Sequence, residues 1–91
     1  MRARVTFLPM SEGGRRTPAM SGIRPRLKVG DRFTSCIVRS NIGDDVFLLG
    51  QEYEVELELV FRPGNRDAPA PGDPVELFEG GRRIATGRLK A

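Results

Sequence analysis

The sequence predicts an all-β protein built as a small barrel or sandwich. Three observations lead to this fold class. Residues 52–61 alternate between acidic and apolar side chains, several shorter segments are rich in apolar strand formers, and 11 Gly and 7 Pro supply frequent turns. About five to seven short strands at this spacing are typical of a small barrel or sandwich. Because 91 residues is the length of one domain, we take residues 1–91 as a single domain.

The clearest strand covers residues 52–61. A period of two places an apolar set of side chains on one face and four glutamates on the other. The apolar set is Tyr53, Val55, Leu57, Leu59 and Phe61, and the acidic set is Glu52, Glu54, Glu56 and Glu58. A helix would spread these glutamates around its circumference, whereas one dry face and one wet face are typical of an antiparallel sheet.

The remaining strands are shorter and are bounded by turn residues. They are predicted at residues 2–8, 32–39, 45–49, 75–78 and 83–89, with residues 27–29 pairing weakly between loops. In the first of them Ala3, Val5 and Phe7 share a face. Cys36 lies inside a strand pattern and is expected to be buried as a small hydrophobic residue.

The connections contain strong strand breakers. Residues 79–82 are expected to form the turn of a final hairpin, and the glycine pairs at 13–14 and 80–81 are expected to be hairpin turns that use positive φ. The stretch 62–73 contains three of the seven prolines and lies outside the sheet, because proline cannot donate to a strand ladder. No helix is predicted.

Charge is distributed unevenly along the chain. Residues 1–39 carry a balance of +7, residues 40–91 carry −4, and the whole chain carries +3. A basic half can attract a polyanion such as RNA. Alternatively, the arginines simply solvate exposed strand faces, and composition alone does not decide between the two.

The composition argues against an enzyme. The chain has no histidine, and its single cysteine lies in a strand pattern with no plausible base beside it. The four glutamates at 52–58 are interpreted as a solvated strand face, and neither glycine pair has the spacing of a phosphate loop. We therefore expect no catalytic residue, no metal, no cofactor and no GTP.

The expected location is the cytoplasm. No apolar run reaches the roughly 20 residues that a membrane helix requires, and residues 1–4 enter the strand pattern without the apolar core of a signal peptide. One cysteine cannot form an internal disulfide, so the sequence contains no sign of an oxidising compartment. No membrane partner is expected.

Two motifs resemble one known family. Glu-Gly-Gly-Arg-Arg-Thr-Pro at residues 12–18, followed by Gly-Ile-Arg-Pro-Arg-Leu at 22–27, resembles the start of the C-terminal (third-domain) β-barrel of elongation factor Tu. Phe-Glu-Gly-Gly-Arg-Arg-Ile-Ala-Thr-Gly at residues 78–87 is similar to the closing hairpin of that barrel. The resemblance spans nearly the whole chain. It implies a closed antiparallel barrel of six strands, here as a stand-alone domain without the GTPase domain that precedes it in the factor.

The resemblance also implies candidate residues for binding nucleic acid, because the family's barrel contacts the T-stem of aminoacyl-tRNA. The positions that match those contacts are Arg15, Arg16, Arg26, Ser35 (or Thr34 if the turn is shifted by one), Glu79 and Gly80. Arg16 and Arg26 stand where the family has His and Gln. Arginine can meet a phosphate with a planar fork of donors, so these replacements keep phosphate contact possible.

Two hypotheses for the function follow. In the first, the barrel is a non-catalytic protein-interaction or structural module that binds another protein or a second copy of itself. In the alternative, it is a translation-related module that grips the backbone of a tRNA or another structured RNA. Arg15 and Arg16 are then the best single candidates for a functional contact, whereas Arg24 is expected to brace its loop through backbone carbonyls.

Overall fold

The computed structural model describes residues 1–41, 43, 45–59 and 70–90. Within these ranges the chain forms eight β-strands and one short 3₁₀ turn, and no helix there has the length and apolar character needed to cross a bilayer. The elements are β1 (Arg2–Phe7), η1 (Met10–Glu12), β2 (Ala19–Met20), β3 (Arg26–Val29), β4 (Arg32–Ser40), β5 (Val46–Phe47), β6 (Glu52–Leu59), β7 (Pro74–Glu79) and β8 (Arg82–Leu89).

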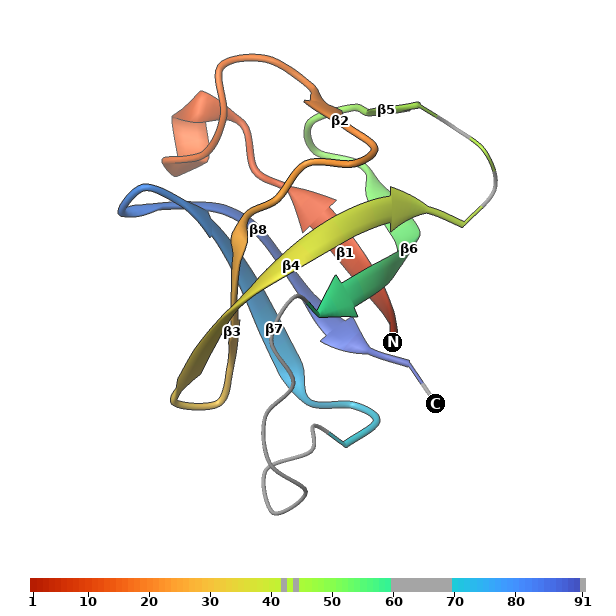
Figure 1. Cartoon of the computed structure of the whole chain (residues 1–91). Coiled ribbons are helices and arrows are strands. Elements are labelled where there is room, and N and C mark those ends of the chain that lie inside the picture. The colour runs from red at the N-terminus through yellow and green to blue at the C-terminus, as the bar shows by residue number, and fades with distance from the viewer. Residues whose placement is uncertain (42, 44, 60–69, 91) are drawn as a thin grey trace.

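Six of the strands close into a barrel. Their order around it is β1-β6-β4-β3-β7-β8, with β8 returning to β1, and every pair is antiparallel (Figure 1). The other two strands, β2 and β5, form a separate two-stranded sheet near the end of the barrel where β1 finishes. The predicted all-β class and the expected closed antiparallel barrel of six strands are thereby confirmed.

Several local predictions are corrected by the structure. Residues 27–29 do not pair weakly: β3 is a full member of the barrel, hydrogen-bonded to β4 on one side and to β7 on the other. The strand expected at 45–49 is only Val46–Phe47, and its partner β2 was not predicted. A strand of two residues is too short to show a period, so β2 had no sequence signal. A 3₁₀ turn occupies Met10–Glu12, where no helix was predicted.

Two predictions concern parts of the chain outside the described residues. They are the placement of Phe61 on the apolar face of the long strand, and most of the loop at 62–73. Elsewhere the strand bounds agree with the sequence to within a residue or two, which is the usual uncertainty at strand ends.

The inside of the barrel is filled by the apolar face of each strand. Ala3, Val5 and Phe7 of β1 are fully buried, as are Val55 and Leu57 of β6, so the predicted alternation holds on both strands. The alternation fails on β8, where Ile84 and Ala85 are consecutive and both buried. The β7–β8 register shifts between Leu77 and Phe78, which leaves Ile84 as the extra residue of a β-bulge.

The glutamates of β6 lie between two arginine-bearing strands. Arg4 of β1 lies directly opposite Glu54, and Arg39 of β4 forms an ion pair with Glu58 at 3.1 Å. Lys90 donates to Glu54 at 2.6 Å, and this hydrogen bond holds the pKa of the Glu54 carboxyl below its usual value. The pairing of β6 with β1 and β4 therefore places glutamates from the acidic half of the sequence next to arginines from its basic half.

Cys36 is fully buried in the core, as predicted, and its burial raises the pKa of the thiol to about 12. At about pH 8 only about 10⁻⁴ of the native thiol is then ionised, and the thiolate is the reactive form. We expect Cys36 to react with a disulfide reagent orders of magnitude more slowly in the native protein than in concentrated guanidinium chloride, where one equivalent reacts rapidly. The measurement is the absorbance of released thiolate against time. Equal rates in the two conditions would contradict the burial of this thiol.

Candidate functional site

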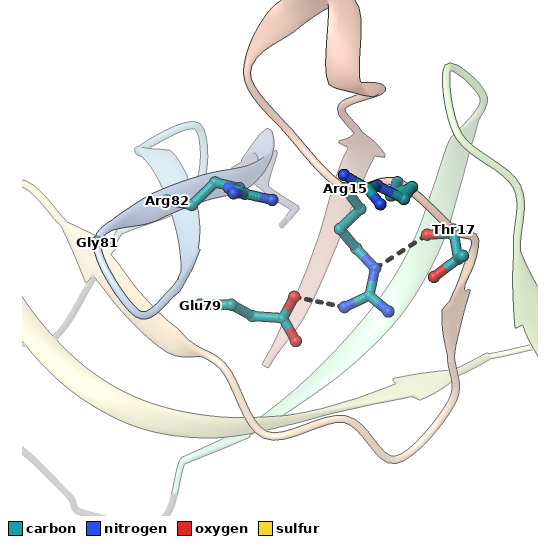
Figure 2. A pocket seen from close by; sticks show the side chains of 6 residues that line it. Arg15, Thr17, Glu79, Gly81 and Arg82 are labelled. Atoms are coloured by element: carbon teal, nitrogen blue, oxygen red, sulfur yellow. Dashed lines mark hydrogen bonds and ion pairs between the residues drawn. The ribbon is translucent and has the colours of Figure 1, made fainter.

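A surface cleft lies where the loop after β1 meets the turn between β7 and β8. Its volume is ≈ 510 Å³, and it is lined by Arg15, Arg16, Thr17, Glu79, Gly81 and Arg82 (Figure 2). We call this site the basic cleft, because its lining contains three arginines and only one carboxylate. The two parts of its wall come from segments far apart in the chain, residues 15–17 and residues 79–82.

The loop that carries Arg15 is shaped by the glycine pair before it. Gly13 has φ +82° and ends the 3₁₀ turn by donating its N–H to the Met10 carbonyl at 3.0 Å. Gly14 has no positive φ, but a Cβ there would lie 1.9 Å from the carbonyl oxygen of Leu8. The predicted hairpin at 13–14 is therefore wrong: these glycines let the chain fold back closely on the end of β1, where the Arg15 N–H donates to the Leu8 carbonyl at 2.8 Å.

Arg15 is held by contacts within the protein. Its Nε donates to the Thr17 carbonyl at 3.1 Å, and one Nη forms an ion pair with the Glu79 carboxylate (Figure 2). Its side chain is 19% exposed, so the guanidinium is largely covered. Arg15 thus ties the loop to the end of β7, and its charge is matched by Glu79. The bracing expected of Arg24 is carried by Arg15 instead; Arg24 is exposed and has no side-chain hydrogen bond to any described residue.

The other two arginines of the cleft are differently placed. Arg16 is exposed, and neither Arg16 nor Arg82 forms an ion pair with a described residue. Arg82 makes one long hydrogen bond, 3.4 Å from its Nη1 to the Gly14 carbonyl. Two guanidinium groups therefore face solvent at one site with much of their hydrogen-bonding capacity unused, which suits the binding of an anion.

The turn beside the cleft has the predicted form. Strand β7 ends at Glu79, β8 begins at Arg82, and the two residues between them are Gly80 and Gly81. Gly80 has φ +56° and Gly81 has no positive φ, so glycine is needed for the conformation of the first turn residue. This short turn holds Glu79 and Arg82 directly opposite one another.

A second group of side chains lies on the outer face of β3, β4 and β7. Arg26 of β3 lies directly opposite Ser35 of β4 and Phe78 of β7. The guanidinium carbon of Arg26 is 4.5 Å from the centre of the Phe33 ring, and the Nζ of Lys28 is 5.7 Å from it. The Phe33 and Phe78 rings are 5.7 Å apart at an angle of 60°. We call Arg26, Lys28, Phe33 and Phe78 the aromatic–basic patch.

The six predicted site residues fall into these two neighbouring groups. Arg15, Arg16 and Glu79 line the basic cleft, and Gly80 forms the turn beside it. Arg26 and Ser35 lie opposite each other on β3 and β4, and of these two strands only β3 pairs with β7. Strand β7 contributes to both groups, because Phe78 of the patch and Glu79 of the cleft are its last two residues. That any of these residues contacts nucleic acid stays a prediction.

Sequence reasoning missed the contributions of Arg82 and Phe33. Arg82 was assigned only to a turn. Phe33 was assigned to a strand without a face, because Cys36, Ile37 and Val38 are consecutive apolar residues, all three buried, and give β4 no clear alternation. No family model matches this sequence. The fold and the site together define a small, closed, six-stranded antiparallel β-barrel with a basic cleft at one end of β7.

Proposed function

We propose that this protein is a non-catalytic β-barrel that binds the sugar–phosphate backbone of a structured RNA, such as a tRNA stem, in a translation-related role in the cytoplasm. One observation carries the proposal. Arg16 and Arg82 come together in the basic cleft without an ion-pair partner among the described residues, and Arg26 of β3 lies opposite Phe78, the residue before Glu79 of the cleft. Phosphate contacts of this kind position an RNA stem without reading its bases.

The distribution of the other charges supports this choice over a general solvating role. Arg2 and Arg4 of β1 and Arg39 of β4 lie against the glutamates of β6, as in the Arg39–Glu58 pair. Of the four charged groups in the basic cleft only Arg15 and Glu79 are paired with each other, which leaves an excess of two positive charges there. A local positive field of this kind attracts a polyanion.

The resemblance to the C-terminal barrel of elongation factor Tu supports the same choice. The segments 12–18 and 78–87, which carry the resemblance, supply all six residues that line the basic cleft. On this proposal the two segments together form a surface that binds the RNA backbone. Arg16 and Arg82 are its phosphate contacts, and the Arg15–Glu79 ion pair positions the loop.

The test is a titration of a labelled tRNA stem-loop by fluorescence anisotropy at two salt concentrations. If Arg16, Arg26 and Arg82 each neutralise one phosphate, the affinity should fall about 40-fold between about 50 and about 200 mM salt. We expect Arg16→Gln and Arg82→Gln each to weaken binding about tenfold at low salt. Each should also reduce the slope of log affinity against log salt by about 1, because one phosphate contact is lost.

The matched control is Arg39→Gln, which removes the same charge from a site where Glu58 already neutralises it. This variant should bind the stem-loop as the unmodified protein does. The proposal is wrong if the protein fails to bind at low salt, if the affinity does not depend on salt, or if Arg39→Gln weakens binding as much as Arg16→Gln.

A protein-interaction role is the second candidate, and a different surface favours it. Met20 and Val46 lie directly opposite each other on the outer side of the β2–β5 sheet; they are 53% and 39% exposed, and Leu48, two residues further on, is 47% exposed. An exposed apolar group of this kind can form part of a protein interface. Size-exclusion chromatography of the samples used for the titration separates the two roles: a monomer that binds the stem-loop supports the first, and a dimer or a complex without RNA supports the second.

A further inference from the structure

The aromatic–basic patch places two phenylalanine rings on the outside of the barrel. Phe33 is 47% exposed, and neither Phe33 nor Phe78 belongs to the core cluster or packs against it. The ring of Phe33 points outward because it shares the strand parity of Ser35, whereas Thr34 and Cys36 face the interior. The fold therefore does not need these rings for its core, and a paired, exposed aromatic surface calls for another explanation.

Both cations of the patch lie against the Phe33 ring. Glu76 lies opposite Lys28, but its carboxylate forms an ion pair with Arg83 at 3.6 Å. Arg26 and Lys28 have no ion-pair partner among the described residues. The surface thus offers a flat ring, a flat guanidinium 4.5 Å from the ring centre, and two positive charges in one place.

A nucleotide matches this combination better than a peptide does. Its base is a planar ring that stacks on aromatic side chains and on guanidinium planes. Its phosphate supplies a negative charge that can pair with Arg26 and Lys28. A hydrophobic peptide side chain would cover the rings and leave Arg26 and Lys28 unmatched. In a stem the bases are already stacked on each other, so only an unpaired base can use this surface.

We propose that the aromatic–basic patch stacks an unpaired base of the RNA whose stem lies in the basic cleft. This inference rests on the proposed RNA-binding function and names the kind of RNA: a stem with an unpaired nucleotide next to it. Both sites are carried by the end of β7, where Phe78 of the patch and Glu79 of the cleft are consecutive residues and Arg26 lies opposite Phe78. The cleft supplies backbone contacts, and the patch distinguishes a stem with an unpaired base from a plain stem.

The test compares two RNA hairpins that differ only in the bases of a short 3′ tail. One tail carries purines and the other consists of abasic residues, so both have the same phosphates. We expect the full chain to bind the purine-tailed hairpin at least about fivefold more tightly, which is the lower end for one base stacked on an aromatic ring. Phe33→Leu, which keeps the apolar bulk, and Arg26→Lys, which keeps the charge, should both remove this preference.

The control variant is Leu48→Ala, which truncates an equally exposed apolar side chain on the segment after β5. This variant should retain the full preference for the purine tail. Circular dichroism of each variant checks that the barrel is folded.

The outcomes separate the inference from the proposed function. If both hairpins bind equally and salt weakens both, stem binding stands and the stacking site is wrong. If the preference survives in Phe33→Leu, the base stacks elsewhere and the inference is also wrong. If neither hairpin binds at low salt, the proposed function fails and the inference fails with it. If the chain self-associates and Phe33→Leu abolishes the association, the patch is a protein interface and the inference is overturned.

Discussion

Replacing Gly87 with alanine should destabilise the barrel by about 3 kcal/mol or more, which is the upper range for overpacking a core site. A Cβ at this position would lie 1.9 Å from the Arg4 carbonyl oxygen and 2.8 Å from the Val5 Cα. All of these atoms belong to the backbone of the neighbouring strand, so no side chain can rotate to make room. Strands β1 and β8 would have to separate at the seam where Gly87 lies directly opposite Val5.

The effect is large relative to the total stability of a domain of this size, which is about 5 to 15 kcal/mol. The measurement is the free energy of unfolding from urea denaturation followed by circular dichroism. The matched control is Gly81→Ala, where the added Cβ has no atom within 4 Å and the backbone has no positive φ. Gly81→Ala should change the stability by less than about 0.5 kcal/mol. If both variants unfolded at the same urea concentration, the close approach of the two strands would be wrong.

Replacing Phe47 with alanine should cost about 3 to 5 kcal/mol, the usual range for a buried phenylalanine. Its ring stacks on Phe7 with 5.1 Å between ring centres and meets Tyr53 edge-on at 5.2 Å. The Tyr53 hydroxyl in turn accepts a hydrogen bond from the Leu48 N–H at 2.9 Å. Phe47 is therefore the main link between the β2–β5 sheet and the barrel.

The loss should be concentrated in that sheet, because two strands of two residues each are not stable without packing. We expect hydrogen exchange at Ser21, whose N–H donates to the Asp45 carbonyl at 2.8 Å, to accelerate more than exchange in the barrel strands. Val46→Ala, which truncates the exposed neighbour of Phe47, is the control and should be close to neutral. Unchanged protection at Ser21 in Phe47→Ala would contradict an anchoring role for this ring.

The limits of sequence reasoning show clearly at single residues. Burial of Cys36 and of alternate residues on β1 was predictable, because a strand's period is a local property. The roles of Arg15 and Arg24 were not. Both are arginines in loop segments rich in Gly and Pro, and only the folded chain brings Glu79 to one of them. The pairing of β2 with β5 escaped prediction for a similar reason, since Ala19 and Phe47 are far apart along the chain and become partners only in the folded structure.

The two glycine pairs make the same point. Both were expected to be hairpin turns, and at 80–81 that was right because strands flank the pair on both sides. At 13–14 the glycines instead allow a close approach to Leu8, and no pattern within the sequence signals a contact with a backbone oxygen six residues away.

The sequence by itself determined that this protein is a small all-β domain, because alternation and turn residues act over a few positions along the chain. The charge pattern could not be interpreted in the same way, since a residue's neighbours along the chain do not say which strand will lie beside it. The tertiary structure placed β6 between β1 and β4, which sets Arg2, Arg4 and Arg39 against glutamates. It also brought Arg16 and Arg82 together without a carboxylate for each among the described residues, and this arrangement supports the proposed RNA-binding site.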